Sequence, residues 1–194
     1  MATTLKYSRR EAHEVTFGGV KIGSTHPIAV QSMTNTPTAD VALSVEQTKR
    51  IAEAGAEIVR LTAQGKREGE ALAPIMQRLD EEGVKAAIVA DIHFTPEIAM
   101  IAAEAVDKVR INPGNIGGDE NVKAVANCCK AAGVPIRIGV NSGSLEKEIL
   151  AKYGAPTAEA LVESALHHAS LLEKFDFNDI IISIKSSNVQ TMVK

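Results

Sequence analysis

The chain has 194 residues, of which 45% are hydrophobic, 23% charged and only 3% aromatic, and its formal net charge at pH 7 is −3. A chain this long buries about 70% of its unfolded surface, which is enough for one hydrophobic core. This slight excess of acidic over basic residues excludes a protein that binds polyanions with its whole surface, although it allows a local anion site.

The first fifteen residues, MATTLKYSRREAHEV, lack the apolar stretch of a secretory signal, and no apolar run in the chain approaches the ~18 residues of a membrane span. The two cysteines are adjacent, so they cannot join distant segments by a disulfide. We therefore expect a soluble, reduced, cytoplasmic protein with neither nucleic acid nor membrane as a partner.

The first predicted element is a short hairpin at 14–23, in which Gly18-Gly19 is the turn signal. Six β-prone runs follow, at 27–33, 56–61, 85–92, 107–111, 135–140 and 179–184. Stretches of helical character lie between most of them, at 44–54, 67–82, 96–105, 121–132 and 157–174. This alternation of strands and helices predicts a parallel sheet covered by helices.

Local signals mark the ends of these helices. Gly55, Gly83 and Gly133 each fall just past a helical stretch, where a left-handed residue is favoured, and Thr157 is a suitable N-cap for the last helix. The spacing of this last helix predicts one apolar face, formed by Leu161, Ala165, Leu166, Ala169 and Leu172.

The fold class predicted by this pattern is a (β/α)8 TIM-type barrel. No Gly-x-Gly-x-x-Gly follows the first strand, which argues against a dinucleotide-binding doubly wound sheet. A complete barrel needs about 250 residues, whereas this chain supplies about six of the eight βα units. We expect residues 1–194 to be the N-terminal part of a barrel from a longer polypeptide, with the hairpin closing its bottom.

Charged residues occur at or near the carboxyl ends of the predicted strands, where barrel active sites form. Four of them are cations, Arg60, Arg110, Arg137 and Lys185, whereas Asp91 is the only obvious carboxylate. Any one of these cations alone is most simply a surface ion-pair partner. Four at equivalent strand positions favour an anion site, because arginine binds phosphate with a bidentate fork and lysine binds it as a point charge.

Other polar residues have less specific interpretations. Asp91 and His93 are about equally well explained as a local hydrogen-bonded pair or as a pair that orients substrate or moves a proton. The turns 112–115 and 141–144 offer backbone N–H groups to an anion. The other histidines are expected at solvated positions, namely His13, His26, His167 and His168.

Cys128 and Cys129 lie in a predicted helix, and adjacent cysteines do not have the Cys-x-x-Cys spacing of zinc or iron–sulfur sites. Buried thiols are the simpler interpretation. We expect no metal ligands and no bound cofactor within this chain.

The strand-end segments also carry a specific resemblance. They are VQSMTNT at 30–36, VADIHF at 89–94, VRINPGN at 109–115, IRIGVNSGSL at 136–145, KYGAPTAEALVESAL at 152–166 and ISIKSS at 182–187. Together they closely resemble the 4-hydroxy-3-methylbut-2-en-1-yl diphosphate synthases, the iron–sulfur reductases of the non-mevalonate isoprenoid pathway. The resemblance extends from about residue 14 to the last residue.

The resemblance implies an N-terminal barrel that binds 2-C-methyl-D-erythritol 2,4-cyclodiphosphate. It also implies a C-terminal domain that holds a 4Fe-4S cluster through three cysteines and a glutamate, a homodimer, and electron delivery by ferredoxin or flavodoxin. The cluster domain and the last two barrel strands are absent from this chain, so we expect it to be inactive alone and to bind substrate weakly.

The resemblance also implies roles for individual residues. Asp91 and His93 would orient the erythritol part and are the only candidates for a catalytic role, and Asn112 would line the pocket. The residues that would bind the diphosphate are Arg60, Arg110, Arg137, Asn141 and Lys185.

Two alternatives belong to other functional classes. One is a pterin-binding barrel transferase similar to dihydropteroate synthase, which would also bind a diphosphate at the barrel mouth. The other is a non-enzymatic phosphate-binding regulatory or scaffold barrel.

Overall fold

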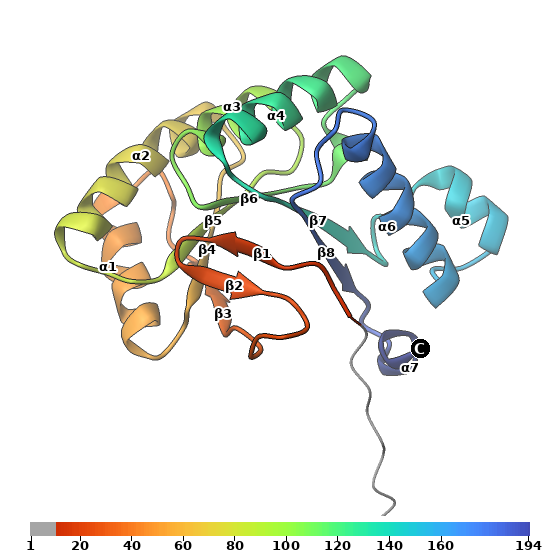
Figure 1. Ribbon diagram of the computed structural model, residues 1–194, viewed down its shortest axis with the longest axis horizontal. Coiled ribbons are helices and arrows are strands. Elements are labelled where there is room, and N and C mark those ends of the chain that lie inside the picture. Colours follow the sequence, from red (N-terminus) through yellow and green to blue (C-terminus); the bar gives the residue numbers. More distant parts are fainter. Residues whose placement is uncertain (1–10) are drawn as a thin grey trace, which may run out of the picture.

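The computed structural model describes residues 11–194 of the chain (Figure 1). Most of the segment examined for a secretory signal, residues 1–10, lies outside the described residues. The strands are β1 (Val15–Phe17), β2 (Val20–Ile22), β3 (Gln31–Met33), β4 (Ile58–Thr62), β5 (Ala87–Asp91), β6 (Lys108–Ile111), β7 (Ile136–Asn141) and β8 (Ile180–Lys185). The helices are α1 (Val41–Glu53), α2 (Lys66–Glu81), α3 (Pro96–Ala103), the 3₁₀ turn η1 (Pro113–Asn115), α4 (Asp119–Ala132), α5 (Lys147–Tyr153), α6 (Ala158–Glu173) and α7 (Val189–Val193).

Six strands form one parallel sheet in the order β3-β4-β5-β6-β7-β8, so each strand pairs with the next one along the chain. The helices form an arc along the outer side of this sheet (Figure 1). The sheet curls strongly, so that Arg137 Nη1 on β7 donates to Gln31 Oε1 on β3 at 2.7 Å across the concave side, although three strands separate β3 from β7. These observations confirm the predicted fold class, a TIM-type arrangement of which six βα units are present.

The two faces of the sheet differ in chemistry because side chains alternate along each strand. The outer face packs against the helices and forms the main core, in which Leu61, Ile88, Val109 and Ile138 are all at most 1% exposed. The inner face is apolar at the amino ends of β4 and β5, and it carries Lys108 at the start of β6 and further charged side chains on β4 to β8. The charged side chains that the sequence analysis selected on β4 to β8 therefore lie on the concave side.

The hairpin β1–β2 covers the apolar end of the inner face. Val15 and Phe17 form a second buried cluster with Ile58, Ala87 and Val89, whose positions lie at or near the amino ends of β4 and β5. The turn approaches so closely that a Cβ on Gly18 would lie 2.7 Å from the Ala87 Cβ. This packing confirms the predicted hairpin and its place at the barrel bottom (Figure 1).

Most helix signals in the sequence agree with the structure. Thr157 accepts a hydrogen bond from Ala160 N as the N-cap of α6. Gly55, Gly83 and Gly133 adopt positive φ values of 100°, 68° and 67°. The expected apolar face of α6 is wrong at one position, since Leu166 is 60% exposed while the other members are buried.

Two short helices, α5 and α7, were not predicted, because seven and five residues are too few to show a period. Within residues 11–194, no helix combines the length and the apolar character needed to traverse a membrane.

Candidate anion-binding site

On the concave face of the sheet, three arginines and one carboxylate lie at similar heights along the barrel axis. Asp91, Arg110 and Arg137 are consecutive register partners on β5, β6 and β7. Arg60 on β4 is paired with Val89, two residues before Asp91, so its side chain lies on the same face. Parallel pairing and strand alternation thus gather charges that are far apart in the sequence.

Asp91 is the central anion of this cluster. Its side chain is only 5% exposed, and its Oδ1 accepts a hydrogen bond from Arg110 Nη1 at 2.8 Å. The Oδ2 lies 3.4 Å from Arg60 Nε. One carboxylate therefore balances two guanidinium groups, which leaves them with hydrogen-bond donors available to a further anion.

Arg137 has only neutral direct partners. Its Nη1 donates to Gln31 Oε1 and its Nη2 donates to Ser183 Oγ, at 2.7 and 2.8 Å. Burial lowers the pKa of Arg137, the positive charges of Arg60 and Arg110 lower it further, and Asp91 opposes them. The cluster of Arg60, Asp91, Arg110 and Arg137, which we call the arginine cluster, therefore carries a surplus of positive charge.

His93 extends the cluster beyond the end of β5. Its Nε2 lies 3.5 Å from Asp91 Oδ1, and its Nδ1 lies 3.1 Å from the amide nitrogen of Gln64. Since an amide nitrogen donates, the neutral tautomer that suits both contacts carries its proton on Nε2, towards Asp91. His93 is thereby oriented at the rim of the cluster, partly exposed to solvent.

The two asparagines build the turns that border the concave face. Asn112 is buried and its Oδ1 accepts a hydrogen bond from Gly114 N at 3.1 Å, which shapes η1. Asn141 Oδ1 accepts in the same way from Gly143 N at 3.1 Å. Within residues 11–194, neither asparagine side chain forms a hydrogen bond with the arginine cluster.

Lys185 is separated from the arginines along the barrel axis. It is the last residue of β8, it pairs with Asn141, and its inner-face position is four residues beyond the register partner of Arg137. Its exposed Nζ donates to Ser187 Oγ at 3.4 Å. The expectation that the four cations occupy equivalent strand positions is therefore wrong, since Arg137 is the second residue of its strand and Lys185 the last of its own.

His168 is not at the solvated position that the sequence analysis assigned to it. It lies on α6, is fully buried, and contacts the carboxylate of Glu146 at the start of α5. Burial lowers its pKa, and the charge of Glu146 opposes that effect. The turn η1 lies directly against it, since a Cβ on Gly114 would be 2.5 Å from His168 Cε1.

The arrangement includes residues that the sequence analysis did not select. Gln31 and Ser183 bond Arg137, and Gln64 bonds His93. Lys108 lies on the same face as Arg110, two residues before it. Strand alternation was the available signal for Lys108, because it places every second residue of β6 on the concave face.

The cysteines do not have the properties of metal ligands. Cys129 is completely buried in the helix-facing core, and burial raises the pKa of its thiol to about 12. Cys128 Sγ contacts Met100 O at 3.6 Å. Residues 11–194 contain no group of three or more His, Cys, Asp or Glu side chains that could hold a metal ion.

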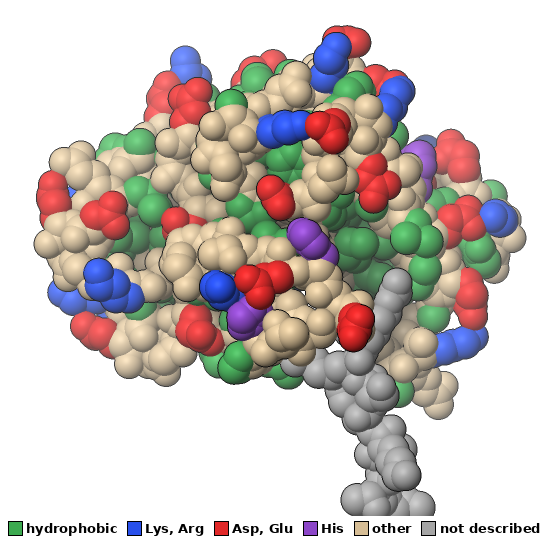
Figure 2. Space-filling view, viewed as in Figure 1, with side chains coloured by type: hydrophobic (Ala, Val, Ile, Leu, Met, Phe, Trp, Pro, Cys, Tyr) green, Lys and Arg blue, Asp and Glu red, His purple; other side chains and the backbone are tan. Residues whose placement is uncertain are grey.

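The face of the molecule drawn in Figure 2 shows no large field of one charge. Lys, Arg, Asp and Glu side chains are interspersed over the face drawn in Figure 2. The arginine cluster thus combines a surplus of positive charge with a small, partly enclosed position, which fits a small anion better than an extended polyanion.

Residues 12–194 match the family model described as the GcpE TIM-barrel domain. Curated relatives named 4-hydroxy-3-methylbut-2-en-1-yl diphosphate synthase (flavodoxin) include one from Fusobacterium nucleatum, 51% identical over 186 residues. Another, from Alcanivorax borkumensis, is 48% identical over 190 residues. The alignments cover 95% and 97% of this chain but 51% and 50% of those relatives, so the chain spans about half their length.

Solved structures with lower sequence identity share the fold. A truncated 3-deoxy-D-arabino-heptulosonate 7-phosphate synthase from Thermotoga maritima matches 92% of this chain and 60% of its own, with TM-score 0.62 and 15% identity. Dihydropteroate synthase from Xanthomonas albilineans matches 87% of this chain and 63% of its own, with TM-score 0.60 and 18% identity. At such identities the likeness shows the barrel arrangement alone, so it gives the transferase alternative no functional support.

Proposed function

This chain belongs to the GcpE TIM-barrel domain family, and we propose that it is the substrate-binding barrel of a 4-hydroxy-3-methylbut-2-en-1-yl diphosphate synthase. The proposed substrate of the complete enzyme is 2-C-methyl-D-erythritol 2,4-cyclodiphosphate, whose ring is opened reductively with loss of a hydroxyl group as water. The proposed location is the cytoplasm. The contribution of residues 11–194 is to bind and orient the cyclodiphosphate.

The observation that carries this proposal is the surplus of guanidinium groups over carboxylates on the concave face. Three arginines surround Asp91, and Arg137 has no ionic partner of its own among the described residues. Each guanidinium can donate two parallel hydrogen bonds to a phosphate. A diphosphate would supply the negative charge that the arginine cluster lacks, and the surrounding protein would strengthen the attraction because the site is half-buried.

The proposed role of each residue depends on whether it lies within the concave face or at its rim. Arg60, Arg110 and Arg137 bind the phosphate oxygens, while Asn141 and Lys185 contact the same ligand from the rim. Asp91 holds Arg60 and Arg110 in place. Asp91 and His93 are the polar groups available to the erythritol hydroxyls, and Asn112 lines the same side of the pocket.

We assign no electron-transfer step to this chain. Cys128 and Cys129 do not fit a 4Fe-4S cluster, since they are adjacent on α4 and Cys129 is directed into the core. The cluster, its domain, the homodimer and the flavodoxin or ferredoxin donor belong to our proposal for the complete enzyme. The names of the curated relatives favour flavodoxin.

Isothermal titration calorimetry with the cyclodiphosphate tests the binding role. We expect the 194-residue chain to bind it without turnover, and more weakly as salt is added, because salt screens the charges. Arg137→Met removes two charge-assisted hydrogen-bond donors, so we expect binding to weaken by roughly tenfold or more.

The matched control is Arg78→Met, because Arg78 lies on the exposed side of α2 beside Glu82. This variant should bind as the wild type does. Equal affinities for the wild type and Arg137→Met, or no binding by the wild type, would contradict the proposed site.

A further inference from the structure

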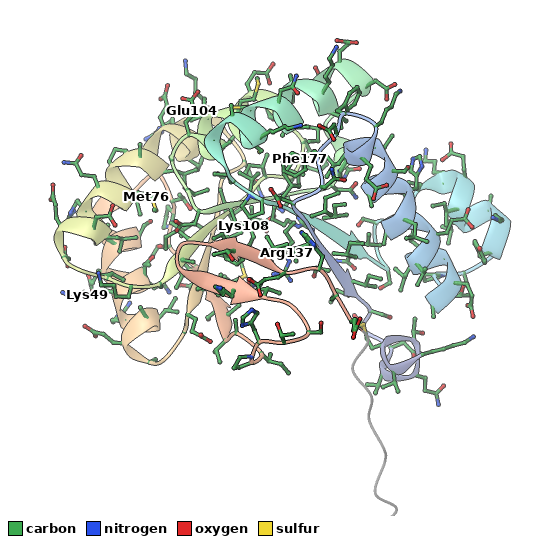
Figure 3. All side chains as sticks on the ribbon, in the orientation of Figure 1. Lys49, Met76, Glu104, Lys108, Arg137 and Phe177 are labelled. Atoms are coloured by element: carbon green, nitrogen blue, oxygen red, sulfur yellow. The ribbon has the colours of Figure 1, made fainter. Side chains whose placement is uncertain are left out.

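Lys108 occupies an unusual position for a lysine. It is the first residue of β6, and its register partner on β5 is Val89, which in turn pairs with Arg60. Its side chain lies on the concave face below Arg110, between the arginine cluster and the hairpin. Figure 3 labels Lys108 and Arg137 in this region, behind β1 and β2.

The ammonium group is enclosed without an acceptor. Lys108 is 0% exposed, and its Nζ has no hydrogen-bond partner within residues 11–194. The Nζ lies over the face of the Phe17 ring, 3.7 Å from the ring centroid. A buried ammonium group without an anionic partner is costly, and a cation–π contact offsets only part of that cost.

The charges near Lys108 come from four strands. Arg137 on β7 repels it, and Arg110 and Arg60 belong to the same cluster. Asp91 on β5 is the nearby anion, but it already bonds Arg60 and Arg110. The hairpin contributes the neutral Phe17, and β3 and β8 contribute the neutral Gln31 and Ser183. Asp107 is engaged with Ile88 N at 2.7 Å.

Burial and the positive charge of Arg137 lower the pKa of Lys108 to about 7. The group therefore changes charge within the physiological range, and its charge depends on that of its neighbours. Any anion that neutralises Arg137 weakens the repulsion and favours the protonated form.

We propose that Lys108 is an additional, proton-linked member of the anion site, which gains a proton from solvent when a diphosphate binds the arginine cluster and loses it when the site empties. The inference rests on the proposed function and deepens it. The step forms one N–H bond between the Nζ lone pair and a proton from the buffer, and no other bond changes. The added charge then adds to the positive field that the arginines present to the diphosphate, so Lys108 is a positioning residue and not a direct ligand.

The linkage has a defined direction. Because occupancy raises the pKa of Lys108, protonated Lys108 must in turn favour the occupied site. Affinity should therefore fall as pH rises above 7, by roughly tenfold for each unit by which occupancy raises the pKa.

Calorimetric titration of the 194-residue chain with inorganic pyrophosphate tests this coupling. Titrations between pH 6 and 9 are run in pairs of buffers with different ionisation enthalpies. They give the number of protons that are taken up for each pyrophosphate bound. Lys108→Met retains an unbranched side chain, one heavy atom shorter, without the titrating group. We expect the wild type to take up about 0.5 to 1 proton more than this variant near pH 8, because the protons of pyrophosphate itself cancel in the comparison.

The control is Lys49→Met, which removes an exposed lysine paired with Glu82 on the outer surface. It should match the wild type in proton uptake and in pH dependence. Equal proton uptake by the wild type and Lys108→Met, with both binding pyrophosphate, overturns the role of Lys108 and leaves the proposed function standing. If the wild type does not bind pyrophosphate at any pH, both proposals fail.

A second measurement does not depend on the folding of Lys108→Met. The ¹³Cε resonance of Lys108 in ¹³C-lysine-labelled protein, assigned by its absence in Lys108→Arg, follows protonation directly. Its midpoint should lie near 7 in the free protein and higher with saturating pyrophosphate. A midpoint above 9 in the free protein, or one unchanged by bound pyrophosphate, overturns the proposal.

Discussion

The Asp91 carboxylate joins two arginines that would otherwise repel each other on the concave face. Its side chain is nearly inaccessible, and it contacts both Arg60 and Arg110. A bound anion would take over part of this role, because it would also lie among the guanidinium groups. Asp91 therefore links the stability of the free chain to the occupancy of the proposed site.

We predict that Asp91→Asn lowers the free energy of unfolding by about 2–3 kcal/mol in anion-free buffer, because it leaves two partly buried guanidinium groups without their counter-charge. Added pyrophosphate should restore part of this loss, since it binds the native state and replaces the missing charge. Urea unfolding with and without pyrophosphate measures both effects.

Asp107→Asn is the matched control for this prediction. The Asp107 carboxylate is half-buried, and it accepts a hydrogen bond from a backbone N–H rather than from an arginine. Loss of this carboxylate should lower the free energy of unfolding, but pyrophosphate should stabilise the variant no more than it stabilises the wild type. The interpretation of Asp91 is wrong if pyrophosphate stabilises Asp91→Asn no more than the wild type.

Helix α6 supports the turns on the concave rim. The turn η1 after β6 lies against His168 through Gly114, and Glu146 at the start of α5 contacts His168 and accepts a hydrogen bond from Ser164 Oγ at 3.1 Å. The turns that carry Asn112 and Asn141 are therefore fixed partly by a helix on the outer side of the sheet. This support is a property of packing between elements.

We predict that Gly114→Ala lowers the free energy of unfolding by about 1–3 kcal/mol, because the new Cβ would overlap the buried imidazole of His168. Removing the imidazole in Gly114→Ala/His168→Ala should relieve this overlap, so the two effects should not add. Gly118→Ala is the control, since a Cβ there would meet nothing within 4 Å. Additive effects in the double variant would show that the close approach is not the cause.

An apolar groove lies beside one edge of the curled sheet. Its volume is about 1110 Å³, and it is lined by parts of α5, α6, β8 and α7. Val162, Leu166 and Met192 line this groove and expose between 47% and 60% of their surfaces, and hydrophobic side chains reach the surface beside α6 in Figure 2. In the described part of the chain β8 pairs only with β7, so its other edge is open.

We predict that this chain associates with itself as its concentration rises, because an open strand edge beside an exposed apolar groove favours pairing between chains. Leu166→Glu should shift the protein towards the monomer, as measured by sedimentation equilibrium. Glu97→Lys on α3, away from the groove, serves as the control. A wild-type chain that stays monomeric at all concentrations would contradict the prediction.

The sequence by itself determined the order of the elements, the parallel pairing and the face that carries the charges. These properties depend on local rules: alternation along a strand, apolar strands covered on both sides, and caps such as Thr157. The same alternation would have located Lys108 on the concave face. It could not show that Phe17 covers its Nζ.

Only the tertiary structure decided how far along the barrel axis each charged side chain lies, which side chains are buried and which distant segments are in contact. Gln31 and Arg137 are 106 residues apart and meet because the sheet curls. His168 is buried and Leu166 exposed on the same helix, because neighbouring turns cover one part of its surface and leave another open. Periodicity gives the direction of a side chain within its own element, whereas curvature and packing between elements decide which neighbour it meets and how much water it retains.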